Sequence, residues 1–384
     1  MREAAESALR RRVHGPGSNS DRPRFRAAIE RMLPYVPGEQ PAPGEQLIKL
    51  NTNENPYPPA PEVRRALRRA AVAPLGLYPA PRATGFISEA SRLYGFKREM
   101  ILAGNGSDEL LGMIFRVVLG SGDRVAYPVP TYSLYDTLAA IQQARVAAVP
   151  YDSDFVLPIL GLARTRARLT IVCNPNSPSG TMVSPKVLEH LARRLHGRFL
   201  VIDEAYVDFA DSHALGLVHK HSNVLVLRSL SKSFSLAGMR LGLCFAHPEI
   251  IDGLLKVKDS YNLSAPAIAA GAQALRCADW MRANVARVKR TRARAEQALS
   301  AMGFRVPPSS ANFVWAALPG RDLGPIAEAL RRRGILVRHF PSLPDGLRIS
   351  IGKPAQMRAL LKELRPLAEP LVRAASDGRG RGRG

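Results

Sequence analysis

Seven short apolar runs between residues 100 and 265 constrain the fold of this chain more than any other feature. They alternate with longer stretches in which apolar residues recur at helical spacing, such as SDELLGMIFRVVLG and SPKVLEHLARRLHG. Strands separated by helices form a largely parallel sheet with helices on both faces. The runs that we predict as strands are MILAG, RVAYPV, RVAAVP, RLTIVCN, FLVID, NVLVLRS and LGLCFA. The pattern therefore predicts an α/β fold around a mostly parallel seven-stranded sheet.

The chain is too long for a single hydrophobic core, and its rhythm changes after residue 265. A chain of 384 residues exceeds the length at which single cores stop growing. From Ser264 to about Met302 it reads as a long helical stretch, followed by short strands and a final helix from Pro354 to Leu367. We predict a flexible N-terminal tail (1–30), an arm that joins the small domain (31–74), a large domain (75–265), a small α+β domain (266–370) and a disordered Arg/Gly tail (371–384).

The composition is that of a globular protein without metal or membrane signals. Hydrophobic residues make up 46% of the chain, and no apolar run reaches the roughly 18 residues of a membrane span. Cys173, Cys244 and Cys277 have no ligand-like spacing, so we predict no metal site. The N-terminus lacks a secretory or transit signal, which favours the cytoplasm. The net charge of +23 is scattered over helix faces, which makes nucleic-acid binding the minority hypothesis.

Polar residues gather where the predicted strands end. Ligands bind at the carboxyl ends of parallel strands, so we expect these residues to carry the function. GNGSDELL places Gly106, Ser107 and Asp108 at the start of a helix, where backbone N–H groups and the helix dipole can hold an anion. FLVIDEAY ends an apolar strand with Asp203, and Tyr206 follows. Each signal is weak alone, because an ordinary helix cap uses the same residue types.

Two further strand ends make the combination specific. IVCNPNSPSGT is a turn rich in Asn, Pro and Gly, and RSLSKSFSLAGMR carries Ser229, Ser231, Lys232 and Arg240. A lysine amine can lose its proton on burial, so it can act as a base or form a Schiff base, whereas an arginine cannot. One sheet thus presents a phosphate cradle, a carboxylate, an amine and a cation. This set predicts a site for a phosphorylated, nitrogen-containing ring.

The order of these motifs resembles that of the fold-type I pyridoxal-phosphate enzymes, the aspartate-aminotransferase superfamily. Within it, the motifs are similar to those of the histidinol-phosphate aminotransferases, from about Leu33 to Leu367. The motifs that carry the resemblance are LPYVPG, KLNTNENPY, YPAPRAT, GNGSDELL, PTYSLY, NPNSPSG, DEAYVDF, SLSKSFSLAGMRLG, SANFVWA, GILVRHF and LRISIG. The resemblance implies a three-layer large domain that binds pyridoxal 5'-phosphate and a smaller α+β domain.

The same resemblance implies a role for each residue at the strand ends. Lys232 would form the Schiff base with the cofactor and move the proton at the substrate Cα. Asp203 would keep the pyridine nitrogen protonated, which makes the ring an electron sink. Tyr206 would hydrogen-bond the phenolic oxygen, and Tyr132 would stack on the ring. The residues implied to hold the phosphate are Gly106, Ser107, Asp108, Ser229, Ser231 and Arg240, with Tyr78 reaching it from the neighbouring subunit of a homodimer.

The resemblance also implies how the substrate is held. Arg348 in LRIS matches the arginine that clamps the substrate anion, for which a planar bidentate fork is suited. Arg338 in GILVRHF matches a second anion-binding arginine, and Tyr35 and Asn55 fall in arms that close over the substrate in the family.

One turn departs from the family pattern. The family usually has Asn-Pro-Thr-Gly, whereas this chain has Ser177-Pro178-Ser179-Gly180. Ser177 therefore replaces the asparagine that contacts the phenolic oxygen. Because its hydroxyl is shorter, we expect it to need a water or help from Asn176.

The resemblance implies an enzyme that transaminates L-histidinol phosphate, a small-molecule amino donor, with 2-oxoglutarate as the 2-oxo acid, in histidine biosynthesis. An aromatic amino-acid aminotransferase would carry the same motifs, and so would a related lyase, a threonine-phosphate decarboxylase. The choice between transamination and decarboxylation depends on pocket geometry. An arginine-rich nucleic-acid binder with a degenerate cofactor site is disfavoured by the intact set of Lys232, Asp203, Tyr206 and Arg240.

Overall fold

A computed structural model describes residues 23–32 and 37–380, with side chains through Val372. The chain divides into two compact units, residues 1–34 and 35–384. The described part of the first unit holds one helical turn, α2 (Ala27–Glu30). Most of the predicted N-terminal tail therefore lies outside the described residues.

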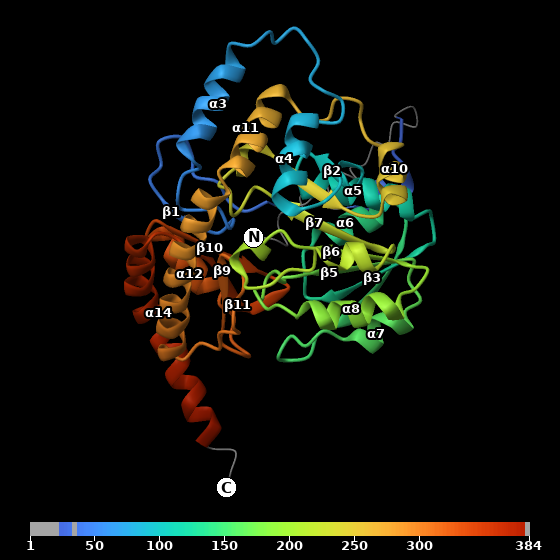
Figure 1. Cartoon of the computed structure of the whole chain (residues 1–384). Helices are drawn as coiled ribbons and strands as arrows, with labels where there is room; N and C mark the ends of the chain where they lie inside the picture. The colour runs from blue at the N-terminus through green and yellow to red at the C-terminus, as the bar shows by residue number, and fades with distance from the viewer. Residues whose placement is uncertain (1–22, 33–36, 381–384) are drawn as a thin grey trace. The chain divides into compact units, whose positions relative to one another are not determined.

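The second unit contains the predicted seven-stranded sheet (Figure 1). Its strands are β2 (Ile101–Gly104), β3 (Arg124–Val129), β4 (Arg145–Pro150), β5 (Leu169–Cys173), β6 (Phe199–Asp203), β7 (Val224–Ser229) and β8 (Gly242–Phe245). They lie in the order β2-β8-β7-β6-β5-β3-β4, and β8 runs antiparallel to both of its neighbours while the other pairs are parallel. The predicted α/β class and the seven strands are confirmed.

Helices cover both faces of this sheet because its strands are apolar on both sides. On β7, Val224 and Val226 belong to one hydrophobic core, whereas Leu225 and Leu227 belong to a second core on the opposite face. The helices that precede, follow or connect the strands are α3 (Pro61–Ala71), α4 (Thr84–Tyr94), α5 (Ser107–Val118), α6 (Leu134–Ile141), α7 (Ile159–Arg164), α8 (Pro185–Arg194), α9 (Leu217–Lys220), α10 (Pro248–Leu255) and α11 (Ala265–Arg276). Helices α5, α6 and α10 supply side chains to the second core, and α4, α7, α8 and α11 to the first, which makes three layers.

Short 3-10 turns lie between these elements. They are η1 (Arg98–Met100), η2 (Val207–Phe209) and η3 (Ala237–Met239). Two of them follow strand ends that the sequence marked as functional, since η2 comes after Tyr206 and η3 ends just before Arg240. The chain therefore turns sharply at these two strand ends.

A second sheet combines the two ends of this unit. It contains β1 (Ile48–Leu50), β10 (Ile335–Phe340), β11 (Leu343–Ser350) and β9 (Phe313–Ala317), in that order, with β1 parallel to β10 and the other pairs antiparallel. Its helices are α12 (Ala278–Ala301), α13 (Gly324–Arg332) and α14 (Pro354–Gly380). The pairing of β1 with β10 supports our proposal that the N-terminal arm belongs to a smaller lobe.

The structure differs from the expected helices in two places. The predicted stretch from Ser264 to Met302 is two helices, because α11 ends at Arg276 and α12 starts at Ala278. Helix α14 continues to Gly380 rather than ending at Leu367, so residues 371–380, expected in a disordered tail, are helical. Leu371 and Val372 pack against the core and extend the apolar face of α14 past Pro366 and Pro370.

No helix in the described part of the chain combines the length and the apolar character that crossing a bilayer requires.

Candidate active site

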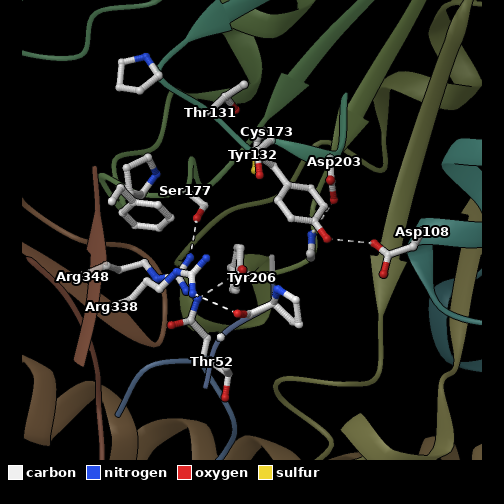
Figure 2. A pocket seen from close by; sticks show the side chains of 18 of the residues that line it. Thr52, Asp108, Thr131, Tyr132, Cys173, Ser177, Asp203, Tyr206, Arg338 and Arg348 are labelled. Carbon is white, nitrogen blue, oxygen red and sulfur yellow. Dashed lines mark hydrogen bonds between the residues drawn. The ribbon is translucent and has the colours of Figure 1, made fainter. Parts of the chain in front are cut away.

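A cavity of about 410 Å³ lies where the strand ends of the large sheet face the small sheet. The large sheet contributes residues that follow β3, β5, β6 and β7 and the start of α5, and the small sheet contributes residues of β10 and β11 and the segment after β1. Figure 2 shows these side chains pointing toward one space. The predicted site residues that line this cavity are Ser107, Asp108, Tyr132, Ser177, Asp203, Tyr206, Ser229, Ser231, Lys232, Arg240, Arg338 and Arg348.

Lys232 lies in the loop after β7, and its side chain is partly buried at the cavity. Its Nζ donates a hydrogen bond to the backbone oxygen of Thr52, 3.1 Å away. Burial, together with the positive charge of Arg348, lowers the pKa of the Lys232 amine to about 8. A substantial fraction of the amine is therefore neutral near physiological pH, which a nucleophile or base requires.

Asp203 ends β6 and is buried at 2% exposure. Its Oδ2 accepts a hydrogen bond from the Tyr135 hydroxyl at 2.8 Å, and its Oδ1 accepts one from the backbone N–H of Ala205 at 3.2 Å. Burial raises the pKa of this carboxyl to about 6, although both hydrogen bonds oppose the shift. Asp203 is thus a basic carboxylate at the floor of the cavity, suited to a cationic N–H partner.

Tyr206 faces the cavity from the segment that follows Asp203. Its hydroxyl accepts a hydrogen bond from Asn53 Nδ2 at 3.2 Å, and its ring meets Phe313 edge-on with centroids 4.9 Å apart. Burial raises the pKa of Tyr206 to about 12, with Arg348 opposing the shift. The hydroxyl therefore keeps its proton and can act as a donor.

One end of the cavity has the features of a phosphate cradle. Helix α5 starts there with no side chain capping it, so the N–H groups of its first turn remain available. Arg240 Nη2 lies 2.8 Å from Asp108 Oδ2. The Tyr132 hydroxyl donates to Asp108 Oδ1 at 3.3 Å, as Figure 2 shows. The Asp108 carboxylate only accepts, so it orients Arg240, and Asp108 can offer a phosphate only its backbone N–H.

Gly106 and Gly242 allow the close backbone approach at this end. A Cβ at Gly106 would lie 2.5 Å from Arg240 Nη2, and Gly106 has a φ of +84°. A Cβ at Gly242 would lie 2.6 Å from the backbone of Gly106 and Ser107. Gly106 does not line the cavity, so the structure gives it a role in spacing rather than a lining position.

The opposite end carries two arginines. Arg338 and Arg348 are Cα partners across β10 and β11, so their side chains leave the same face of the small sheet. Arg348 Nη1 donates to Ser177 Oγ at 3.0 Å, and Nη2 donates to the Asn51 backbone oxygen at 3.0 Å. Arg338 Nη1 donates to the Pro37 backbone oxygen at 3.3 Å. Figure 2 shows the two guanidinium groups side by side.

Two asparagines among the predicted residues do not line the cavity. Asn176 does not line the cavity, because its buried amide holds the turn through Ser179 Oγ at 2.9 Å and the Pro130 backbone oxygen at 3.2 Å. Asn55 does not line it either, and its Nδ2 donates to the backbone oxygens of Lys232 and Ser233 at 3.1 and 3.0 Å.

Tyr78 is 80% exposed and stacks on Tyr261, with ring centroids 4.3 Å apart. It does not line the cavity. Tyr35 lies outside the described residues.

The sequence reasoning missed two partners of the predicted site residues. Tyr135 lies in the first turn of α6 and donates to Asp203, whereas Tyr132 precedes this helix. Asn53 binds Tyr206, and it stands between Asn51 and Asn55 in the quoted KLNTNENPY, in the segment after the strand that ends at Leu50. Asn51 and Asn53 line the cavity, whereas Asn55 does not.

The residues present fit pyridoxal 5'-phosphate. Ser231 Oγ is buried at the cavity and has no hydrogen-bond partner within the structure, as expected of a group that awaits a ligand oxygen. Next to it, the Ser229 hydroxyl accepts from the Ser231 backbone N–H at 3.2 Å. The uncapped helix and Arg240 can bind a phosphate, Asp203 can bind a ring nitrogen, and Lys232 can react with an aldehyde. These three groups of the cofactor therefore have complementary partners in the cavity. Among the described residues, no cluster of three His, Cys, Asp or Glu side chains could hold a metal ion.

Known proteins are similar to this chain in sequence and in fold. The aminotransferase class I and II family model matches residues 45–364. Histidinol-phosphate aminotransferase from Rhodopirellula baltica is 46% identical over 341 residues, covering 88% of this chain and 94% of that protein. Histidinol-phosphate aminotransferase 1 from Nostoc sp. is 44% identical over 347 residues, covering 90% of this chain and 98% of that protein.

A solved structure with the same fold carries the same enzyme name as these relatives. Histidinol-phosphate aminotransferase from Sinorhizobium meliloti, crystallised in complex with pyridoxal-5'-phosphate, superposes with a TM-score of 0.82 at 27% identity. The match covers 93% of this chain and 100% of that one. The fold and the site thus define a pyridoxal 5'-phosphate-dependent enzyme of fold type I. More narrowly, the chain belongs to the class I and II aminotransferases.

The Ser231 hydroxyl allows a test of the phosphate cradle. We expect Ser231→Ala to raise the Kd for pyridoxal 5'-phosphate by about 10-fold, because a hydrogen bond to a charged group is lost. Fluorescence titration of the apoprotein measures the change. Ser235→Ala is the matched control, since it removes another buried, unpartnered hydroxyl of the same loop that does not line the cavity. Equal Kd values for the two variants would show that the Ser231 hydroxyl does not bind the cofactor phosphate.

Proposed function

We propose that this enzyme transfers an amino group from L-histidinol phosphate to 2-oxoglutarate in histidine biosynthesis, and that it works in the cytoplasm. The curated relatives at 46% and 44% identity are named histidinol-phosphate aminotransferases. The observation that carries the proposal is the pair Arg338 and Arg348 at the cavity end opposite the cradle. One site must accept a phosphate monoester in one half-reaction and a dicarboxylate in the other, and two adjacent guanidinium forks suit both anions.

The roles of the protein groups follow from their positions. Bound pyridoxal 5'-phosphate supplies an aldehyde that takes up the amino nitrogen and a ring that accepts electrons from the substrate Cα. Asp203 holds a proton at the ring nitrogen. Lys232, with a pKa near 8, takes the proton from the substrate Cα and returns it. Tyr206 and Ser177 bind the phenolic oxygen, and Tyr132 holds the ring.

Ser177 links the two ends of the site. Its Oγ accepts a hydrogen bond from Arg348 Nη1, so the hydroxyl proton is left to donate elsewhere. The serine that replaces the usual asparagine can therefore serve the phenolic oxygen while it contacts the arginine that clamps the substrate. Asn176 stabilises this turn through its hydrogen bond to Ser179 Oγ and does not line the cavity.

A homodimer with shared active sites is part of this proposal. Tyr78 and Tyr261 form a stacked pair of exposed aromatic rings, at 80% and 45% exposure, on the surface of the single chain. Such a pair suits an interface, through which Tyr78 would reach the phosphate cradle of the partner. Sedimentation equilibrium should give twice the mass of 41.8 kDa. A monomer with full activity would refute this part.

The substrate is tested by single half-reactions of the purified holoenzyme. We expect L-histidinol phosphate and glutamate each to convert the bound cofactor rapidly to its amine form, seen as a change in its absorption, whereas phenylalanine reacts slowly. Faster conversion by phenylalanine or tyrosine would favour an aromatic amino-acid aminotransferase. Release of carbon dioxide from L-threonine phosphate would make the enzyme a decarboxylase.

The lowered pKa of Lys232 predicts how cofactor incorporation depends on pH. Only the neutral amine attacks an aldehyde, so the rate at which apoprotein takes up pyridoxal 5'-phosphate covalently should rise as pH increases through about 8. Stopped-flow absorption between pH 6 and 10 measures the midpoint. A midpoint near 10.5, the ordinary value for lysine, would show that the amine is not depressed by its surroundings.

A further inference from the structure

A buried ionic network lies behind the cavity and has no part in the chemistry described so far. Arg228, on β7 and 4% exposed, bridges two carboxylates. Its Nε lies 2.8 Å from Glu204 Oε2 and its Nη1 lies 2.9 Å from Asp208 Oδ1. The second oxygen of Glu204 accepts from the Ala214 backbone N–H at 2.5 Å, and the guanidinium lies over the Tyr94 ring, 5.6 Å from its centroid.

The members of this network adjoin the reactive residues in sequence. Glu204 follows Asp203 directly, and Asp208 stands two residues after Tyr206. Because Arg228 pairs with both carboxylates, the segment that carries Asp203 and Tyr206 is held against β7 at two points.

The loop that carries Lys232 is attached to the same network. Ser233 follows Lys232, is 2% exposed, and its hydroxyl donates a hydrogen bond to Asp208 Oδ2. On the other side of this loop, Asn55 Nδ2 donates to the backbone oxygens of both Lys232 and Ser233. Asn55 is itself fixed, since its Oδ1 accepts from the Tyr57 backbone N–H at 3.1 Å. The Lys232–Ser233 peptide is thus held by a side-chain contact and by backbone contacts from separate segments.

We propose that Asp208 is a positioning residue for Lys232: through the Ser233 hydroxyl it fixes the lysine loop relative to Asp203 and Tyr206. This inference rests on the proposed role of Lys232. The lysine amine must reach a fixed set of reacting atoms, and a displacement of about 1 Å at such a site can cost about 10²-fold in rate. Asp208 does not line the cavity, so its effect on Lys232 passes through Ser233 rather than through a direct contact.

Ser233→Ala in the holoenzyme tests the contact. We expect kcat to fall by about 10-fold while KM for glutamate stays within about 2-fold, because the amine is misplaced but the substrate arginines are intact. We also expect the pH midpoint of the bound cofactor's absorption change to shift, since the lysine is held less firmly against its neighbours. A purely structural role would lower the melting temperature without moving this midpoint.

The variant is expected to fold. Alanine occupies less volume than serine, and Asp208 keeps its bond to Arg228 and a side-chain exposure of 17%, so water can reach the released oxygen. Ser235→Ala is the matched control, because this hydroxyl of the same loop has no hydrogen-bond partner in the structure. Indistinguishable kcat and absorption midpoints in Ser233→Ala and Ser235→Ala would overturn the proposal.

A second pair of variants decides the question if Ser233→Ala is unstable. Asp208→Asn and Asp208→Ala both remove the charge that faces Arg228, so they share that loss of stability. Only asparagine can still hydrogen-bond the Ser233 hydroxyl. We expect Asp208→Asn to keep the wild-type pH midpoint of cofactor absorption and Asp208→Ala to shift it. Equal midpoints in the two variants would overturn the proposal. The absorption measurement needs no amino donor, so its outcome does not depend on whether the proposed substrate is correct.

Discussion

Lys232→Ala is expected to lower kcat by at least about 10⁴-fold, because it removes the covalent attachment and the proton carrier in one step. Lys232→Arg should be equally inactive, although it keeps the positive charge, since a guanidinium neither loses its proton nor forms a Schiff base. Single-turnover measurements with glutamate, followed by cofactor absorption, give the rate. The exposed Lys353→Ala serves as the control and should match the wild type.

The fold of Lys232→Ala should remain intact. Because the pKa of Lys232 is lowered to about 8 in the folded protein, its charged form costs stability below that pH, and stability from this group rises as pH increases from about 8 toward 10.5. Removing the amine relieves this cost, so the melting temperature at pH 7 should not fall. Near-normal transamination by a well-folded Lys232→Ala would refute the role of the lysine.

Arg348→Gln is expected to lower kcat/KM for both L-histidinol phosphate and glutamate by about 10²-fold, since the guanidinium proposed to pair with the substrate anion is lost. A second effect follows from the structure. The positive charge of Arg348 lowers the pKa of Lys232, so its removal should raise the pH midpoint of cofactor incorporation above about 8. Burial of Lys232 remains and keeps the midpoint below 10.5.

Arg348→Lys separates the two effects. It keeps a positive charge near Lys232, so the midpoint should stay close to the wild-type value, but it loses the bidentate fork, so KM should still rise. Arg358→Gln, on the exposed side of α14, is the control for loss of an arginine. If Arg348→Gln and the control have the same kcat/KM, another group binds the substrate anion. If the midpoint of Arg348→Gln does not move, the two groups do not interact.

Particular residues show where sequence reasoning succeeded. All seven apolar runs became strands of one sheet, because short apolar runs between amphipathic helices favour buried strands. Strand ends of a parallel sheet meet at one edge, and Asp203, Ser231 and Lys232 accordingly line one cavity. The predicted boundaries of α11, α12 and α14 were wrong, because the helical stretch breaks at Cys277 and α14 continues past Leu367, where Val372 packs against the core.

The asparagines show where it stopped. KLNTNENPY offers three of them, and sequence alone could not tell that Asn53 binds Tyr206 while Asn55 binds the lysine loop. The Asn53–Tyr206 contact joins residues 153 positions apart, and the Asn55–Lys232 contact joins residues 177 positions apart. No local sequence pattern encodes contacts over such separations. Likewise, Tyr135 is an ordinary core aromatic in sequence and becomes a partner of Asp203 only when α6 packs on the sheet.

The sequence by itself determined the fold class, the chemical groups available and their order along the chain, because hydrophobic periodicity and residue type are local properties. The tertiary structure alone decided which of those groups face one another, that burial and Arg348 shift the pKa of Lys232, and that Asp208 contacts both Arg228 and the Ser233 hydroxyl of the lysine loop. Electrostatic effects and hydrogen bonds depend on distance in space and on exclusion of water, and both exist only once the chain has folded.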